Sequence, residues 1–156
     1  MTEIKKKIRD RRQEMFTAQK AKDMQKFKEI KLILDRLIEQ ESKIRFNGQE
    51  QKFALRHTPE QIHNFIDLIG YTQKEALEIT DRRIAITLES LQRGEIVPNL
   101  GNNRDHIYKI IAHKGVHSKN GAGVLKLAVS DYLERNGFEH HKDMDHGVFL
   151  VRLQAN

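Results

Sequence analysis

The sequence of 156 residues has no cysteine, and this absence excludes disulfide bonds, thiolate nucleophiles and cysteine metal ligands. No apolar run approaches the roughly 18 residues that a transmembrane helix needs, so no membrane span is predicted. Residues 1–7 carry charges with no apolar stretch after them, which argues against a secretory signal. We therefore expect a soluble intracellular protein. The default location is the cytoplasm, and the nucleus is the alternative.

Glycine and proline are both absent from Met1 to Asn47, where good helix formers dominate. Apolar residues recur there at helical spacings of three, four and seven: Phe27, Ile30, Leu34, Leu37, Ile38 and Ile44. This stretch is predicted to be helical, with a break near Lys22-Asp23 because aspartate is a good N-cap. An antiparallel hairpin of two helices would cover the apolar stripe better than one long rod.

The net charge of +6 lies entirely in the first 60 residues, which hold 16 basic and 10 acidic side chains. Residues 61–156 hold 12 of each, and seven of the eight histidines. The densest basic cluster comprises Lys5, Lys6, Lys7, Arg9, Arg11 and Arg12. Such a cluster is predicted to bind the phosphate backbone of a nucleic acid without reading its sequence. The alternative is a solvated helix face, with Glu14 and other acidic residues interspersed.

The hydrophobic period changes after a polar stretch at 48–60, which we interpret as a linker. Short apolar runs predict strands at about 65–69, 107–111, 138–141 and 148–153, with helices at about 72–93 and 124–136. Thr72 and Glu75 form a capping box at the start of the first of these helices. The order is βαβαββ, with a parallel first connection and a final hairpin. We predict an α/β fold, a two-layer βαβαββ sandwich preceded by an N-terminal helical hairpin.

Ligands of such sheets gather beyond the carboxyl ends of parallel strands. Asp67 ends the first strand, and the basic, glycine-bearing loop 112–121 follows the second and precedes a helix. Its amides and the helix dipole favour a phosphate, to which Lys114, His117 and Lys119 add positive charge. A plain connecting loop, which needs a glycine in any case, is the alternative.

Residues 62–154 resemble the small MutS-related (Smr) domain. The resemblance is carried by Ile66-Asp67-Leu68, the Thr72-capped helix, and His117-Ser118-Lys119-Asn120-Gly121 followed by Leu125-Lys126-Leu127-Ala128-Val129. The family has the βαβαββ order and is known for nicking or cleaving DNA or RNA, including messenger RNA on stalled ribosomes. Charge and composition divide the chain into a basic helical extension at 1–47, a linker at 48–60 and a domain at 61–156, and the resemblance identifies the last of these as Smr-like.

Two family motifs differ here. Leu-Asp-Leu-His-Gly becomes Ile66-Asp67-Leu68-Ile69-Gly70, and in the second motif His113 replaces the first glycine of Gly-x-Gly. Isoleucine cannot transfer a proton, and a residue other than glycine at 113 would crowd an approaching phosphate. The departures therefore degrade the motifs of an endonuclease.

Three residues are the candidates for catalysis. His113 or His117 would transfer the proton, because a histidine pKa lies near neutrality. Asp67 would orient a histidine or hold a divalent ion such as Mg²⁺ through water, unless it only bonds amides at the end of its strand. Lys114, Gly115, Ser118 and Lys119 would bind the phosphate. The leading hypothesis is a nucleic-acid-binding protein related to DNA and RNA endonucleases, and the alternative is a non-catalytic binding or adaptor module on a ribosome or other ribonucleoprotein.

Overall fold

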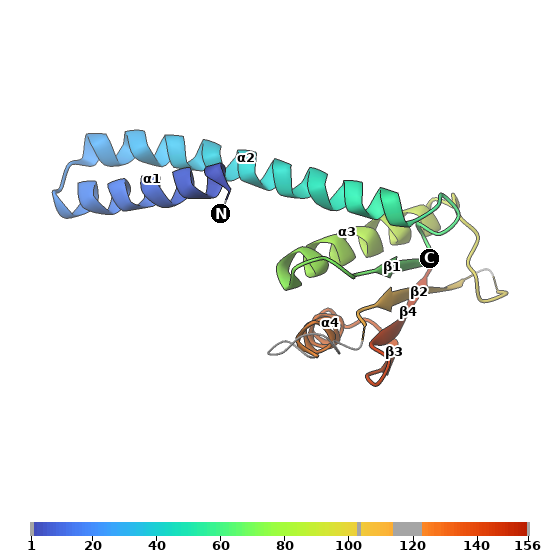
Figure 1. Ribbon diagram of the computed structural model, residues 1–156. Coiled ribbons are helices and arrows are strands. Elements are labelled where there is room, and N and C mark those ends of the chain that lie inside the picture. Colours follow the sequence, from blue (N-terminus) through green and yellow to red (C-terminus); the bar gives the residue numbers. More distant parts are fainter. Residues whose placement is uncertain (1, 103, 114–122, 156) are drawn as a thin grey trace. The chain divides into compact units, whose positions relative to one another are not determined.

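The computed structural model describes residues 2–102, 104–113 and 123–155, and the chain forms two compact units, Met1–Gly48 and Gln49–Asn156. In order, the elements are α1 (Glu3–Lys20), α2 (Met24–Arg56), β1 (Phe65–Asp67), α3 (Gln73–Gln92), β2 (Asp105–Ile111), α4 (Val124–Arg135), β3 (His140–Asp143) and β4 (Val148–Gln154). Figure 1 shows them along the chain. No helix among the described residues is apolar over a length that would cross a membrane.

The first unit is the helical pair expected from the sequence. The Thr2 hydroxyl caps α1 by accepting a hydrogen bond from the Lys5 amide at 3.4 Å. The chain turns at Lys22, whose φ of 57° lies in the left-handed region, and the Asp23 carboxylate then accepts from the Lys26 amide. Along the pair the buried apolar residues are Ile8, Ala18, Ile30 and Leu34. The α1 helix runs back beside the first part of α2 (Figure 1).

The second helix is longer than the sequence suggested, because α2 continues to Arg56 through most of the expected 48–60 linker. The cause is burial at its C-terminal end. Phe53 joins the core of the second unit, and Gln49 is fully buried. Glu50 also forms ion pairs with Arg82 and Arg83 of α3. A polar composition predicted a linker, but these contacts stabilise a helix.

The second unit confirms the βαβαββ sandwich. Its sheet has the order β1-β2-β4-β3, with β1 parallel to β2 and the other pairs antiparallel. On one face, Ile66, Tyr108, Phe149 and their neighbours are buried together with residues of both α3 and α4, so the helices form a single layer. The capping box between Thr72 and Glu75 is present in both directions. Strand β3 begins at His140, two residues later than expected.

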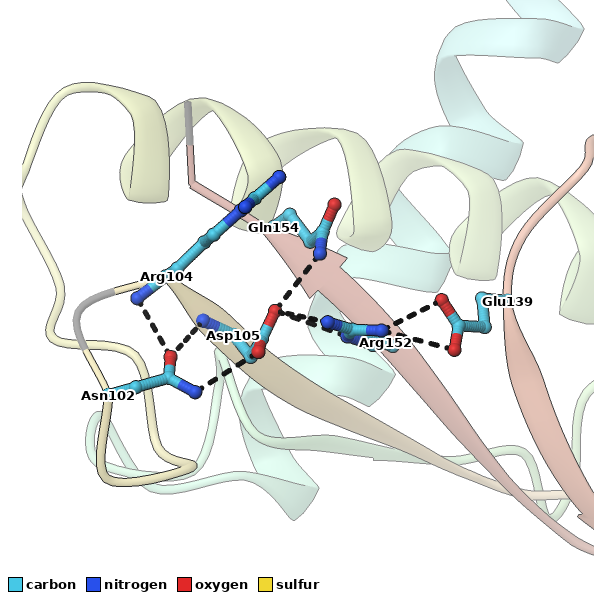
Figure 2. A network of polar contacts seen from close by, with 6 residues as sticks. All are labelled: Asn102, Arg104, Asp105, Glu139, Arg152 and Gln154. Atoms are coloured by element: carbon cyan, nitrogen blue, oxygen red, sulfur yellow. Dashed lines mark hydrogen bonds and ion pairs between the residues drawn. The ribbon is translucent and has the colours of Figure 1, made fainter.

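A polar network holds the start of β2 to β4 and to the segment before β3 (Figure 2). The Arg152 guanidinium binds Asp105 at 3.0 Å and both carboxylate oxygens of Glu139 at 3.1 Å. The hydrogen bond from the Gln154 amide, followed by those from Asn102 and Arg152, holds the pKa of Asp105 below its ordinary value. Arg152 is thus committed to two carboxylates at this end of the sheet.

The turn before β4 approaches the backbone that follows β2. Gly147 has a φ of 64°, and a Cβ atom placed on it would overlap the carbonyl group of His113, with the carbonyl carbon at 2.5 Å. The Ala112 amide donates to the Gly147 carbonyl at 2.7 Å. This close approach fixes the position of His113 and requires glycine at 147.

Asp105→Asn is expected to lower thermal stability at neutral pH, because the ionised carboxylate is favoured in the folded state. A carboxyl group whose pKa is lower in the folded state stabilises the fold at pH values above its ordinary, unfolded-state pKa. That contribution is lost as the pH falls through the folded-state pKa. The deficit in melting temperature should therefore be constant above about pH 5 and shrink below about pH 4. Asp131→Asn, in an exposed pair with Arg135, is the control. A deficit that does not change with pH would contradict the assignment.

Gly147→Ala is expected to destabilise the protein more than Gly137→Ala. Both glycines have positive φ, at 64° and 69°, but a Cβ at 137 would meet nothing within 4 Å. The backbone penalty alone predicts a loss of about 1 kcal/mol for Gly137→Ala. The overlap with His113 raises the loss to about 2–4 kcal/mol for Gly147→Ala. Urea unfolding of both variants measures the difference in free energy of unfolding, and equal losses would show that the overlap with His113 does not add to the cost.

Candidate active site

The parallel pairing of β1 with β2 brings two predicted site residues to one edge of the sheet. Asp67 lies opposite Ile111, and the Leu68 amide donates to the Ile111 carbonyl at 2.9 Å. His113 follows Ile111 by two residues, so its side chain starts beside the end of β1. Parallel strands present their carboxyl ends at the same edge, which is where α/β sheets bind ligands.

Asp67 and His113 are in direct contact. The His113 Nε2 lies 2.6 Å from the Asp67 Oδ1, and the same oxygen accepts a hydrogen bond from the Ile69 amide at 3.0 Å. The carboxylate accepts both bonds, so Nε2 carries the proton and Nδ1 of the neutral ring has the free lone pair. The side chains are 41% and 31% exposed, which leaves this pair accessible to a substrate.

The backbone of His113 adopts the conformation of a glycine. Its φ is 65°, in the left-handed region that residues with a Cβ seldom occupy. The Asp67 contact, the Ala112–Gly147 hydrogen bond and the close approach of Gly147 hold it there. His113 thus combines a backbone conformation typical of glycine with an imidazole side chain.

A second histidine supports Asp67 from inside the protein. The His57 Nε2 accepts a hydrogen bond from the Asp67 amide at 3.3 Å, and its Nδ1 donates to the Phe53 carbonyl at 2.8 Å. The ring is buried and stacks on Phe53 with centroids 4.1 Å apart. His57 is thus a neutral structural residue, which fixes the end of β1.

Sequence reasoning missed two cations beside this edge. The Lys52 ammonium donates to the Gly70 carbonyl at 3.2 Å, and the Arg56 guanidinium donates to the Ile69 carbonyl. They come from the last turns of α2, which were expected to be linker. Their spacing of four residues was the available signal, because it places both on one face of a helix.

The remaining predicted residues are not joined to this pair in the described structure. His117, Lys114, Gly115, Ser118 and Lys119 lie outside the described residues. Ile69 is 54% exposed at the position where the Smr motif has histidine. The basic cluster lies on α1 of the first unit. Three of its members form ion pairs with neighbouring carboxylates: Lys7 with Glu3, Arg9 with Asp10 and Arg11 with Glu14. The other three members are exposed: Lys5, Lys6 and Arg12.

The possible metal role of Asp67 is not supported by a set of ligands. Across residues 2–102, 104–113 and 123–155, no three His, Asp or Glu side chains gather as a metal site would require. The Oδ1 atom of Asp67 already accepts two hydrogen bonds. The carboxylate acts in this structure as a partner of His113.

Comparison with known proteins gives a distant relative. The chain is 29% identical over 112 residues to a yeast protein named Endonuclease NBR9 from Saccharomyces cerevisiae, covering 70% of this chain and 41% of the relative. The chain thus spans less than half the length of that protein. No family model matches the sequence, and no solved structure matches it. The chain is accordingly a distant relative of a protein named an endonuclease, and its assignment to the Smr domain stays a prediction.

Proposed function

We propose that this chain binds nucleic acid and cleaves its phosphodiester bonds at the Asp67–His113 pair. The observation that carries the proposal is the 2.6 Å contact between the His113 Nε2 and the Asp67 Oδ1 at the carboxyl edge of the sheet. The distant similarity to a protein named an endonuclease points to the same chemistry. The substrate is RNA or DNA, free or within a ribonucleoprotein such as a ribosome.

The pair has the arrangement of a carboxylate-oriented general base. Asp67 holds the proton on Nε2 and stabilises the imidazolium that forms when Nδ1 takes up a proton. That proton comes from the attacking hydroxyl, which belongs to water or, in RNA, to the neighbouring ribose. The hydroxyl oxygen forms a bond to phosphorus as the bond to the leaving oxygen breaks. The leaving oxygen then takes a proton from the imidazolium, directly or relayed by a water molecule, which restores the neutral ring.

The second candidate function is binding without cleavage. The exposed Ile69 favours it, because this side chain cannot transfer a proton where the related motif has a histidine. In this case the basic cluster on α1 would anchor the protein to a nucleic acid or ribonucleoprotein. Both candidates require nucleic-acid binding, and they differ in whether His113 acts on the bound strand.

His113→Ala and Asp67→Asn are expected to lower the cleavage rate by about 10²–10⁴-fold, because each removes the oriented base. Labelled single-stranded RNA and DNA, incubated with and without magnesium, provide the measurement. His141→Ala removes an exposed histidine of β3 and should leave the rate unchanged. Cleavage that survives both site substitutions would place the chemistry elsewhere, and its absence in the unmodified protein would favour the binding module.

Replacing Lys5, Lys6 and Arg12 by glutamine is expected to reduce the salt dependence of RNA binding. Each lost contact with a single strand lowers the slope of log K against log salt by about 0.7, so the triple variant should lose about 2. The matched control changes the net charge equally at cations that already pair with a neighbouring carboxylate: Lys43, Arg93 and Arg135. Equal effects of the two triple variants would contradict a specific role for the basic cluster.

A further inference from the structure

Two cations converge on the loop that follows β1. Lys52 and Arg56 donate to the carbonyls of Gly70 and Ile69, respectively. Their charged groups also lie 5.2 Å and 5.4 Å from the centroid of the Tyr71 ring, within the range of cation–π attraction. Two long side chains are therefore held in place on the residues that directly follow Asp67.

Gly70 leaves room for this arrangement. Its φ is 81°, and a Cβ atom on it would lie 2.9 Å from the Arg56 Nη2. A larger residue would push the guanidinium away from the loop. Glycine at 70 thus serves both the left-handed backbone and the approach of the arginine.

Among the described residues, no carboxylate forms an ion pair with Lys52 or Arg56. Glu75 interacts electrostatically with Lys52, but its carboxylate accepts a hydrogen bond in the capping box with Thr72. The neighbouring Arg83, in contrast, is paired with Glu50. Two like charges four residues apart on a helix repel each other, and a bound anion would relieve that repulsion.

Both side chains keep donors for a ligand. A guanidinium has five N–H donors and an ammonium has three, whereas the described hydrogen bonds use one of each. Arginine matches the paired oxygens of a phosphate, and lysine adds a point charge. The carbonyls that anchor them belong to the second and third residues after Asp67, no more than about 10 Å along the chain.

We propose that Lys52 and Arg56 form a binding site for a backbone phosphate of the nucleic acid strand that reaches the Asp67–His113 pair. The inference rests on the proposed function, because it takes the strand to be cleaved as the ligand. The tethered cations hold one phosphate beside β1, and this contact positions the strand relative to the imidazole. The binding edge therefore includes the C-terminal end of α2 as well as the strand ends.

The test measures binding of a fluorescent single-stranded RNA to the full chain at several salt concentrations, with His113→Ala in every variant to prevent cleavage. Lys52→Gln with Arg56→Gln removes the contact with one phosphate and should lower the salt slope by about 0.7. If the affinities converge at 1 M salt, this loss corresponds to about 5-fold weaker binding at 0.1 M. Arg56→Lys, which keeps the charge, should retain most of the slope.

The matched control is Arg93→Gln with Arg104→Gln. Arg93 follows the C-terminal end of α3 and Arg104 precedes the start of β2, and in both elements the other end is the one next to the candidate site. This control should leave the slope nearly unchanged. A Lys52/Arg56 variant with a lower melting temperature but an unchanged salt slope would overturn the inference and assign both residues a structural role only. Cleavage assays without the His113 change separate the two proposals. Cleavage with normal binding by the double variant rejects the phosphate site alone, whereas salt-dependent binding at this site without cleavage rejects the endonuclease alone.

Discussion

The parallel register of β1 with β2 is the constraint on which the candidate site depends. Because Asp67 pairs with Ile111, two segments separated by more than 40 residues end at the same edge of the sheet. A shift of one residue would turn the Asp67 side chain to the other face of the sheet. The buried face, which includes Ile66, Tyr108 and Ile110, excludes that shift because it would expose the apolar side chains to water. The geometry of the catalytic candidates is therefore a consequence of core packing.

The short segment from Gln49 to His57 supports this edge in several ways. Phe53 contributes to the core, and its carbonyl fixes the His57 ring that bonds the Asp67 amide. Lys52 and Arg56, on the exposed side of the same turns, hold the carbonyls that follow β1. The segment thus places a neutral imidazole behind Asp67 and two cations beside it. The charge asymmetry of the sequence predicted a nucleic-acid attachment role for the basic first part, but the last residues of this part fold with the neutral domain and lie at its candidate site.

The elements were predictable where local pattern and tertiary packing agree. The apolar runs around Tyr108 and Phe149 and the capping box at Thr72 specify the sandwich at both levels. The end of α2 was not predictable, because its polar composition hides the burial of Gln49 and the pairing of Glu50 with α3. Lys52 and Arg56 were missed for the same reason. The predicted topology placed Asp67 and His113 near each other. It did not predict their hydrogen bond, because that bond depends on the unusual backbone of His113.

Two residues other than glycine have positive φ in the described part of the chain, and their surroundings differ. Lys22 lies in the turn between two helices, and the turn itself accounts for its φ of 57°. At His113 the left-handed conformation costs on the order of 1 kcal/mol, and three neighbouring contacts hold it in place. These contacts come from two separate segments: Asp67 bonds the His113 side chain, and Gly147 lies against the His113 backbone and accepts a hydrogen bond from the Ala112 amide. A side chain positioned in this way loses little entropy when it meets a substrate, and its Nε2 is already bonded to a carboxylate. The strain is thus part of the same arrangement that orients the imidazole, and this is the physical reason for proposing His113, among the described histidines, as the residue that transfers the proton.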